Sequence, residues 1–175
     1  MTTASLQIAH ELPIAMTATT APAGLAELYE RHYEAVFRAA LRVTGNPADA
    51  EDVLQTVFLR VLAHGVAETG PLPAAYFRRA AVNAAVDLLR RRAVRAASEY
   101  DDESPHAAVP PPSLLKEQLR RAIATLDRDD ATLFLLRHVE GFSNDELAGM
   151  FEIEKNNVAV RLHRIRHRLQ SEMQR

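Results

Sequence analysis

Five cations near the C-terminal end have the types and the spacing needed to bind a phosphate backbone. Apolar residues recur at helical spacing between Lys155 and Leu169, which predicts an amphipathic helix. The cations on its other faces are Lys155, Arg161, Arg164, Arg166 and Arg168. Lysine and arginine neutralise phosphates, and arginine also binds guanine edges. These residues therefore indicate nucleic-acid binding; the alternative is an ordinary helical hairpin with a solvated basic face.

A shorter helix is predicted directly before the basic one. Ser143 and Glu146 have the spacing of a capping box, in which each side chain accepts a hydrogen bond from the other residue's backbone N–H. The apolar stripe that follows consists of Leu147, Met150 and Phe151. Only residues 152–154 separate this helix from the basic one. A short helix, a brief turn and an amphipathic basic helix are typical of the helix-turn-helix that enters a DNA major groove.

Aromatic, amide and cationic side chains gather in a second segment, which contains Tyr76, Phe77, Arg78, Arg79, Asn83, Arg90 and Arg91. Unpaired bases stack on aromatic rings while arginine follows the backbone, so this composition suits single-stranded DNA. The neighbouring loop, residues 68–72, is placed to form a pocket for a base taken out of the stack. Tyr76 and Phe77 could equally be core residues.

The sequence gives little support for a metal site or an enzyme active site. His163 and His167 have the i, i+4 spacing of two metal ligands on one helix face, but no nearby acid completes a set. The chain has no cysteine, which excludes disulfides and thiol chemistry. It also has no Gly-rich phosphate loop and no recognisable nucleophile with a base. We therefore expect no enzyme activity, no cofactor and no metal site.

The elements that must position these groups are all predicted to be helices. Alanine, leucine and arginine are abundant and β-branched residues are few. Gly45 ends the first helix, Asn46 can cap the second, and Pro47 suits its first position; Asp127 with Asp130 can cap the fifth. The helices before the helix-turn-helix are expected at residues 25–43, 47–64, 74–97, 114–126 and from about 128 to Gly141. The fold class expected is all-α.

One clear break divides the chain at residues 98–113, which hold four acids, four prolines and no lysine or arginine. Such a segment cannot bury a core and is typical of a flexible linker. The expected organisation is a flexible tail at 1–23, a helical domain at 24–97, the acidic, Pro-rich linker at 98–113 and a second helical domain at 114–175. At ~3.1 Å per residue the linker could span on the order of 50 Å, so the two basic segments could reach separate DNA sites.

Charge is segregated along a chain whose net charge is only −2. Residues 76–95 and residues 155–175 each carry six cations against one acid. Two local basic patches on a nearly neutral protein indicate that nucleic acid is bound at two places.

No apolar run approaches membrane-spanning length, and residues 1–23 lack the cationic start of a secretory signal. We expect a cytoplasmic protein that makes no membrane contact of its own.

Two segments together resemble the extracytoplasmic-function (ECF) class of bacterial sigma-70 family sigma factors. Region 2 of that family is similar to LYERHYEAVFRAALRVTGNPADAEDVLQTVFLRVL followed by AYFRRAAVNAAVDLLRRR. Region 4 is similar to LRRAIATLDRDDATLFLLRHVEGFSNDELAGMFEIEKNNVAVRLHRIRHRL. The resemblance covers about residues 25–169 apart from the linker. It implies a factor that binds core RNA polymerase, directs it to promoter DNA and is held inactive by an anti-sigma factor.

The resemblance also implies roles for particular residues. The second helix would dock on the clamp helices of the polymerase through Asp49, Glu51, Asp52, Gln55, Phe58 and Arg60. The −10 element would be melted and recognised by Tyr76, Arg78, Arg79, Asn83, Arg90 and Arg91. The −35 duplex would be bound by Lys155, Asn156, Asn157, Ala159, Val160, Arg161 and Arg164. Phosphates repel carboxylates, so an acid-rich helix face suits a protein partner better than DNA; a merely solvated face is the alternative.

The linker has a counterpart in the family, where the connector runs through the positively charged RNA path of the polymerase. The acids of residues 98–113 could therefore imitate nucleic acid in that path. A passive solvated tether is the alternative.

The recognition helix departs from the family's usual pattern. Glu152 stands at a turn position where relatives usually have glycine, so it must adopt a positive φ at a cost, or the turn differs. Asn156 and Asn157 replace a Gly-Thr pair and could bind adenine. Ala159 and Val160 replace a basic residue and a serine, and they could contact thymine methyls. These departures keep a second interpretation open, a sigma-like interaction module that sequesters a regulator without reading DNA.

Overall fold

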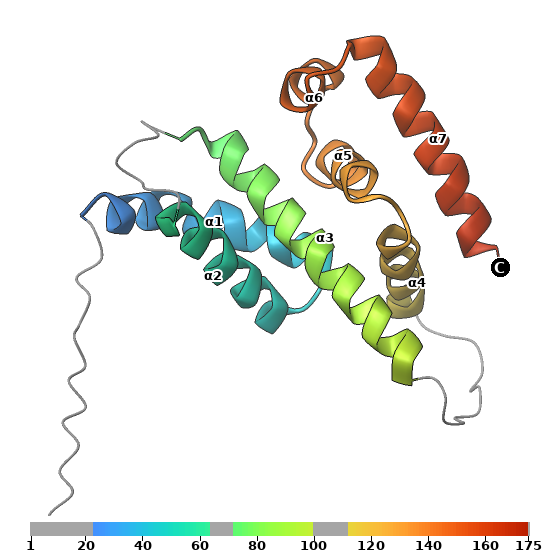
Figure 1. The fold of residues 1–175 in the computed structure, drawn as a ribbon, viewed down its shortest axis with the longest axis horizontal. Coiled ribbons are helices and arrows are strands. Elements are labelled where there is room, and N and C mark those ends of the chain that lie inside the picture. The colour runs from blue at the N-terminus through green and yellow to red at the C-terminus, as the bar shows by residue number, and fades with distance from the viewer. Residues whose placement is uncertain (1–22, 64–71, 100–111, 175) are drawn as a thin grey trace, which may run out of the picture.

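The chain folds into helices throughout the part that the computed structural model describes, which is residues 23–63, 72–99 and 112–174. In chain order these are α1 (Ala23–Thr44), α2 (Pro47–Ala63), α3 (Ala74–Glu99), α4 (Pro112–Ala124), α5 (Arg128–His138), α6 (Asn144–Phe151) and α7 (Lys155–Met173) (Figure 1). The all-α prediction is confirmed. The tail at 1–22, most of the 68–72 loop and most of the linker lie outside the described residues.

Helices α1, α2 and α3 pack together and form what we call the N-terminal bundle. Its core contains alanines without exposed surface, such as Ala39 and Ala85, which let the helix backbones approach closely. Larger side chains fill the remaining space. Phe77 is completely buried, and its ring lies 4.1 Å from the ring of His32 and 5.8 Å from that of Phe58, measured between centroids. Phe77 is therefore a core residue, which was one of the two alternatives left open.

The turn between α1 and α2 follows the prediction. Gly45 has φ +70°, a left-handed conformation that glycine adopts without strain. The side chain of Asn46 accepts a hydrogen bond from the backbone N–H of Ala48 at 2.9 Å, which caps α2. Pro47 is the first residue of α2.

Helices α4 to α7 form the C-terminal bundle, which includes the predicted helix-turn-helix. The capping box is confirmed: the Ser143 N–H donates to Glu146 at 2.7 Å, and the Glu146 N–H donates to the Ser143 hydroxyl at 3.2 Å. The backbone N–H and the hydroxyl of Ser143 both donate to the Glu146 carboxylate at 2.7 Å, and because they favour its charged form they hold the pKa of Glu146 below its ordinary value. The buried stripe of α7 consists of Val158, Leu162, Ile165 and Leu169, as its spacing predicted.

Two details of the C-terminal bundle bear on the predictions. Asp127 is the residue that precedes α5, but its side chain makes no capping hydrogen bond within the described structure, so that expectation is wrong. Its expected partner in capping, Asp130, instead binds Arg161 of α7. Glu152 has φ +54° and ψ +40°, so the left-handed turn expected at this position is present without a glycine.

Glu152→Gly is expected to raise the free energy of unfolding by about 1 kcal/mol, because glycine adopts the left-handed conformation without the clash that a Cβ imposes. Urea denaturation of the whole chain measures this change. Gln170→Gly, inside the regular part of α7, is the matched control and should lower stability by about the same amount. Equal effects at the two positions would contradict a strained turn at Glu152.

Helix α3 lies between the two bundles and contacts both of them. It packs against α1 and α2 on one side and against α4 and α5 on the other (Figure 1). The two bundles are therefore docked together in this structure, although a linker of this length would let them lie apart. We refer to this docking as the closed arrangement.

Candidate nucleic-acid interface

The exposed face of α7 carries most of the residues expected to read duplex DNA. Its exposed members are Lys155, Asn156, Asn157, Ala159, Val160 and Arg164. The opposite face of the helix is buried in the bundle, so the fold leaves this face of α7 open to solvent or a ligand. Lys155 forms an exposed ion pair with Asp145 of α6 at 2.8 Å. A DNA backbone could replace that carboxylate, because exposed ion pairs contribute little stability.

Arg161 differs from its neighbours on α7. Its guanidinium donates a hydrogen bond to the carboxylate of Asp130 at the start of α5, and about one third of its side chain is exposed. This contact braces the recognition helix against α5. Arg164 lies one turn further along α7 and is exposed to solvent. Of the two arginines, Arg164 is the better placed to reach DNA directly.

A hollow between α2 and α3 gathers several residues expected at the −10 element. Its volume is about 310 Å³, and it is lined by Val57, Arg60, Tyr76, Arg79, Ala80 and Asn83. Tyr76 is 43% exposed and meets the buried Phe77 edge-on, with 5.5 Å between ring centroids. An exposed ring next to cations and an amide is suited to stacking an unpaired base. The base pocket predicted from the sequence lies in the 68–72 loop, most of which is outside the described residues.

Apart from Tyr76, the residues expected at the −10 element divide into two groups. Arg90 and Arg91 are exposed on α3, away from the hollow. Arg78, Arg79 and Asn83 contact the C-terminal bundle: Arg78 binds Glu140, Arg79 donates to the carbonyl oxygen of Met150, and Asn83 binds Thr132. No local pattern in the sequence predicts these contacts between the bundles.

The face of α2 that is expected to meet a protein partner needs two corrections. Glu51, Asp52, Gln55 and Arg60 are exposed, as expected. Asp49 was expected to face outward, but it is only 3% exposed and binds Arg92 of α3. Phe58 is buried against Phe77 and Tyr29, so it can support the surface but not form it.

The residues predicted to contact the polymerase did not include two exposed leucines on the same face of α2. Leu59 is 63% exposed and Leu62 is 40% exposed. They follow Asp52 and Gln55 along one stripe of the helix, at i+7 and i+10 from Asp52, and this spacing could have identified them. Exposed leucines beside carboxylates are typical of a protein–protein interface. We call the stripe Asp52, Gln55, Leu59 and Leu62 the α2 stripe.

Three of the histidines in the described part of the chain lie at two places in the fold. His32 is buried against Phe77, and this desolvation, with a smaller contribution from Arg31, holds its pKa below the ordinary value. His163 and His167 are exposed, with 4.5 Å between ring centroids. Within the described ranges, no three His, Cys, Asp or Glu side chains come together in a way that could hold a metal ion. None of the helices described is long and apolar enough to cross a membrane.

Both bundles match families of known proteins. Residues 28–95 match the family described as Sigma-70 region 2, and residues 116–169 match Sigma-70, region 4. The RNA polymerase sigma factor CarQ of Myxococcus xanthus is 35% identical over 143 residues, which cover 79% of this chain and 82% of CarQ. CnrH, solved in complex with the cytosolic domain of CnrY, has a similar fold, with a TM-score of 0.52 and 24% identity over 84% of this chain and 85% of that one.

A relative of the ECF class is also similar. The ECF RNA polymerase sigma factor SigE of Mycolicibacterium smegmatis is 30% identical over 152 residues, which cover 82% of this chain. The match spans 59% of SigE, so the chain corresponds to less than two thirds of that relative. The chain belongs to the sigma-70 family of RNA polymerase sigma factors, and within it to the ECF class.

Proposed function

We propose that this chain is an alternative sigma factor that binds core RNA polymerase and directs it to promoters. It recognises the −35 element as duplex DNA, and it melts and recognises the −10 element. The observation that carries the proposal is the presence of both sigma regions in one chain, each with a chemically suitable exposed surface. The factor supplies binding energy for promoter recognition and strand separation, while the polymerase performs the chemistry. It acts in the cytoplasm, where polymerase and chromosome meet.

The α2 stripe is the proposed contact with the polymerase. Its acidic and amide side chains lie beside two exposed leucines, which together provide a hydrophobic centre and a polar rim. Glu51 and Arg60 extend the polar rim. Duplex DNA is a poor partner for this surface, because carboxylates repel phosphates.

The two DNA surfaces are proposed to read different states of the promoter. The hollow around Tyr76 takes an unpaired base of the −10 element, with Arg79 and Asn83 in its lining. Arg78, Arg90 and Arg91 of the same helix follow the backbone. The exposed face of α7 enters the major groove of the −35 duplex. Its Ala159 and Val160 suit thymine methyls, and its asparagines suit adenine.

Arg164→Ala is expected to weaken binding to −35 duplex DNA roughly tenfold and to reduce the salt dependence of binding by about one counterion. The reason is the loss of one exposed cation from the recognition face. Fluorescence anisotropy with a labelled duplex, repeated at several salt concentrations, measures both effects. Arg31→Ala removes another exposed arginine, from the N-terminal bundle, and should leave the affinity unchanged. Equal losses in the two variants would show that net charge, rather than this face, determines binding.

An anti-sigma factor is the proposed regulatory partner. CnrH was solved in complex with the cytosolic domain of CnrY, and this chain shares its fold. The α2 stripe and the region 4 surfaces are the parts that such a partner would cover.

A sigma-like module that sequesters a regulator without reading DNA is the second candidate, favoured by the apolar pair Ala159 and Val160 on the recognition face. Selection from a random duplex library separates the two functions. With core polymerase and this chain together, we expect enrichment of two short motifs at a fixed spacing, and no such enrichment with polymerase alone. A chain that binds polymerase but enriches no sequence would favour the second candidate.

A further inference from the structure

A second hollow lies between α3 and α4, which are in contact where the two bundles meet (Figure 1). Its volume is about 360 Å³, which is within the range of sites that bind small organic molecules. Such sites occur preferentially where two domains meet. None of the residues that line it belongs to the α2 stripe, to the residues expected at the −10 element or to the exposed face of α7.

The wall that α3 contributes to this hollow is largely apolar. Leu89, Ala93 and Ala96 recur at i, i+4 and i+7, so they lie on one face of the helix. Ala124 of α4 adds a further apolar side chain to the lining. Three of these four residues are alanines, whose short side chains leave room between the helices. The hollow is therefore suited to a compact apolar group.

The other wall is cationic. Arg120 and Arg121 of α4 line the hollow together with Glu117, which is the single acid among the described residues of the lining. The carboxylate of Glu117 lies 3.6 Å from Arg120 and 3.8 Å from Arg121, and half of its side chain is exposed. Exposed ion pairs of this kind contribute little stability, so the anionic group of a ligand could replace Glu117.

Arg120 is held in place by backbone groups of the N-terminal bundle. Its Nε donates a hydrogen bond to the carbonyl oxygen of Val43 at 3.0 Å, and only 21% of its side chain is exposed. Its guanidinium lies against Gly45, where an added Cβ would be 1.9 Å from Nη2. Within the described residues, neither terminal nitrogen of Arg120 makes a hydrogen bond. Arg120 is therefore fixed in position and retains donors for an anion.

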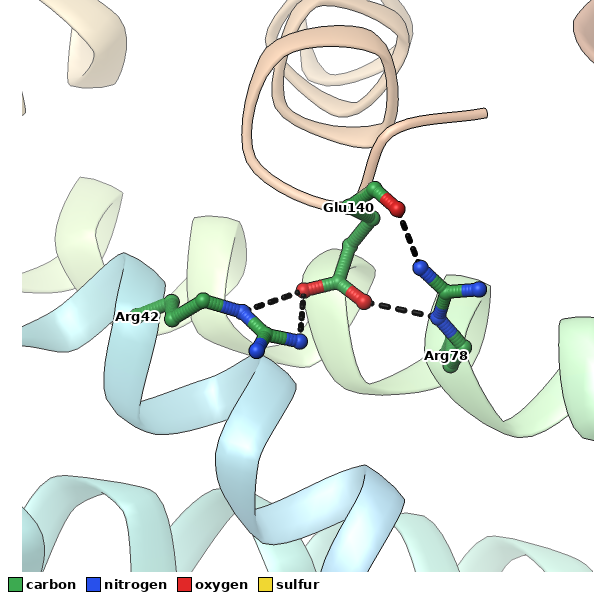
Figure 2. A network of polar contacts seen from close by, with 3 residues as sticks. All are labelled: Arg42, Arg78 and Glu140. Atoms are coloured by element: carbon green, nitrogen blue, oxygen red, sulfur yellow. Dashed lines mark hydrogen bonds and ion pairs between the residues drawn. The ribbon is translucent and has the colours of Figure 1, made fainter. Parts of the chain in front are cut away.

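Two other arginines between the bundles differ from Arg120, because each has a carboxylate within hydrogen-bond distance. Glu140, in the loop after α5, is buried between Arg42 and Arg78 (Figure 2). One of its oxygens accepts from Arg42, at 2.9 Å from Nε and 2.7 Å from Nη2, and the other accepts from Arg78 Nε at 2.7 Å. Charge-assisted bonds of this kind are the strong contacts of a guanidinium. An anion from outside the chain could give Arg120 the same kind of contact.

We infer that the hollow between α3 and α4 binds a small organic anion, in which a carboxylate or a phosphate is joined to a compact apolar group. The anionic group binds Arg120 and Arg121, and the apolar group packs against Ala93 and Ala96. The two walls belong to different bundles, so the site exists in the closed arrangement. The inference goes beyond the proposed function and does not depend on it, because the lining residues serve none of the three proposed surfaces.

Binding can be measured with anilinonaphthalene sulfonate, a fluorescent probe that joins an anionic group to an apolar ring system. Titration of the intact chain should show saturable binding of one probe per chain. Arg120→Gln should weaken this binding at least about tenfold, because charge-assisted hydrogen bonds are lost. The neutral probe N-phenylnaphthylamine should bind both chains equally. Arg38→Gln removes an arginine of α1 that is paired with Glu34, outside the lining, and should change neither affinity.

The apolar part of the site is tested by filling the hollow. Ala93→Leu on one wall and Ala124→Leu on the other should each abolish binding of both probes, because the larger side chain takes the space of the apolar group. Ala48→Leu makes the same substitution at an exposed position of α2 and should leave both affinities unchanged. Circular dichroism shows whether each variant keeps its helices. If both leucine variants of the hollow lose them, Arg120→Gln decides.

Competition distinguishes the two kinds of anion. Decanoate supplies a carboxylate on an acyl chain, and adenosine monophosphate supplies a phosphate on a nucleoside; the one that displaces the probe at the lower concentration identifies the class of ligand. Inorganic phosphate lacks an apolar group and should displace the probe only at a much higher concentration.

Three results would overturn the inference: equal binding of the anionic probe by Arg120→Gln and the unaltered chain, undiminished binding by the folded leucine variants of the hollow, and displacement by inorganic phosphate as readily as by either organic anion. Titration with core polymerase is a separate measurement on the same chain. A chain that binds the probe as expected but does not bind polymerase would keep this inference while the proposed function fails.

Discussion

Replacing Phe77 with alanine is expected to lower the free energy of unfolding of the chain by about 3–5 kcal/mol. The ring has no exposed surface and packs between His32 and Phe58, so its loss leaves a cavity in the centre of the N-terminal bundle. Urea denaturation followed by circular dichroism measures the change.

Its neighbour Tyr76 provides the matched comparison. Tyr76→Ala should leave the stability nearly unchanged, because the ring is 43% exposed. It should instead weaken binding of an unpaired −10 strand, by about 1–3 kcal/mol for one stacked base. Equal destabilisation by the two substitutions would contradict the division between a core ring and a recognition ring.

The second large effect is expected at the α2 stripe. Asp52→Ala combined with Gln55→Ala should weaken binding to core RNA polymerase about 100-fold, which corresponds to a loss of about 1.4 kcal/mol at each of the two interface positions. Stability should change little, since both side chains are exposed. Competition against a labelled sigma factor for core polymerase measures the affinity.

The control for this pair lies in the C-terminal bundle. Asp129→Ala combined with Gln170→Ala removes the same residue types from exposed positions of α5 and α7 and should preserve polymerase binding. Arg161→Ala with Arg164→Ala should likewise preserve it while weakening −35 binding. If the α2 pair and the arginine pair impaired the same step, the proposed assignment of separate surfaces would be wrong.

Features set by neighbouring residues could be predicted from the sequence. The capping box of Ser143 and Glu146, the Asn46 cap and the buried stripe of α7 depend on contacts within a few residues, and the structure has all of them. The left-handed conformation of Glu152 was one of two alternatives that the sequence left open, and the structure has it.

Features set by contacts between distant elements were not predictable. Asp49 belongs to an acidic helix start by its spacing, but Arg92 draws it into the interior, and the two are 43 residues apart in the chain. Glu140 is 98 residues from Arg42 and 62 from Arg78, so no local pattern indicates that it is buried between them. The sequence predicted which residues bind DNA, whereas the docking that covers three of them depends on tertiary structure.

The most direct test of the central claim is a fluorescence titration of the purified, folded chain with bacterial core RNA polymerase. We predict tight one-to-one binding that the combined Asp52→Ala and Gln55→Ala substitutions weaken about 100-fold. A folded chain, free of any inhibitor, that does not bind core polymerase would contradict the assignment as an initiation factor and favour the regulatory module.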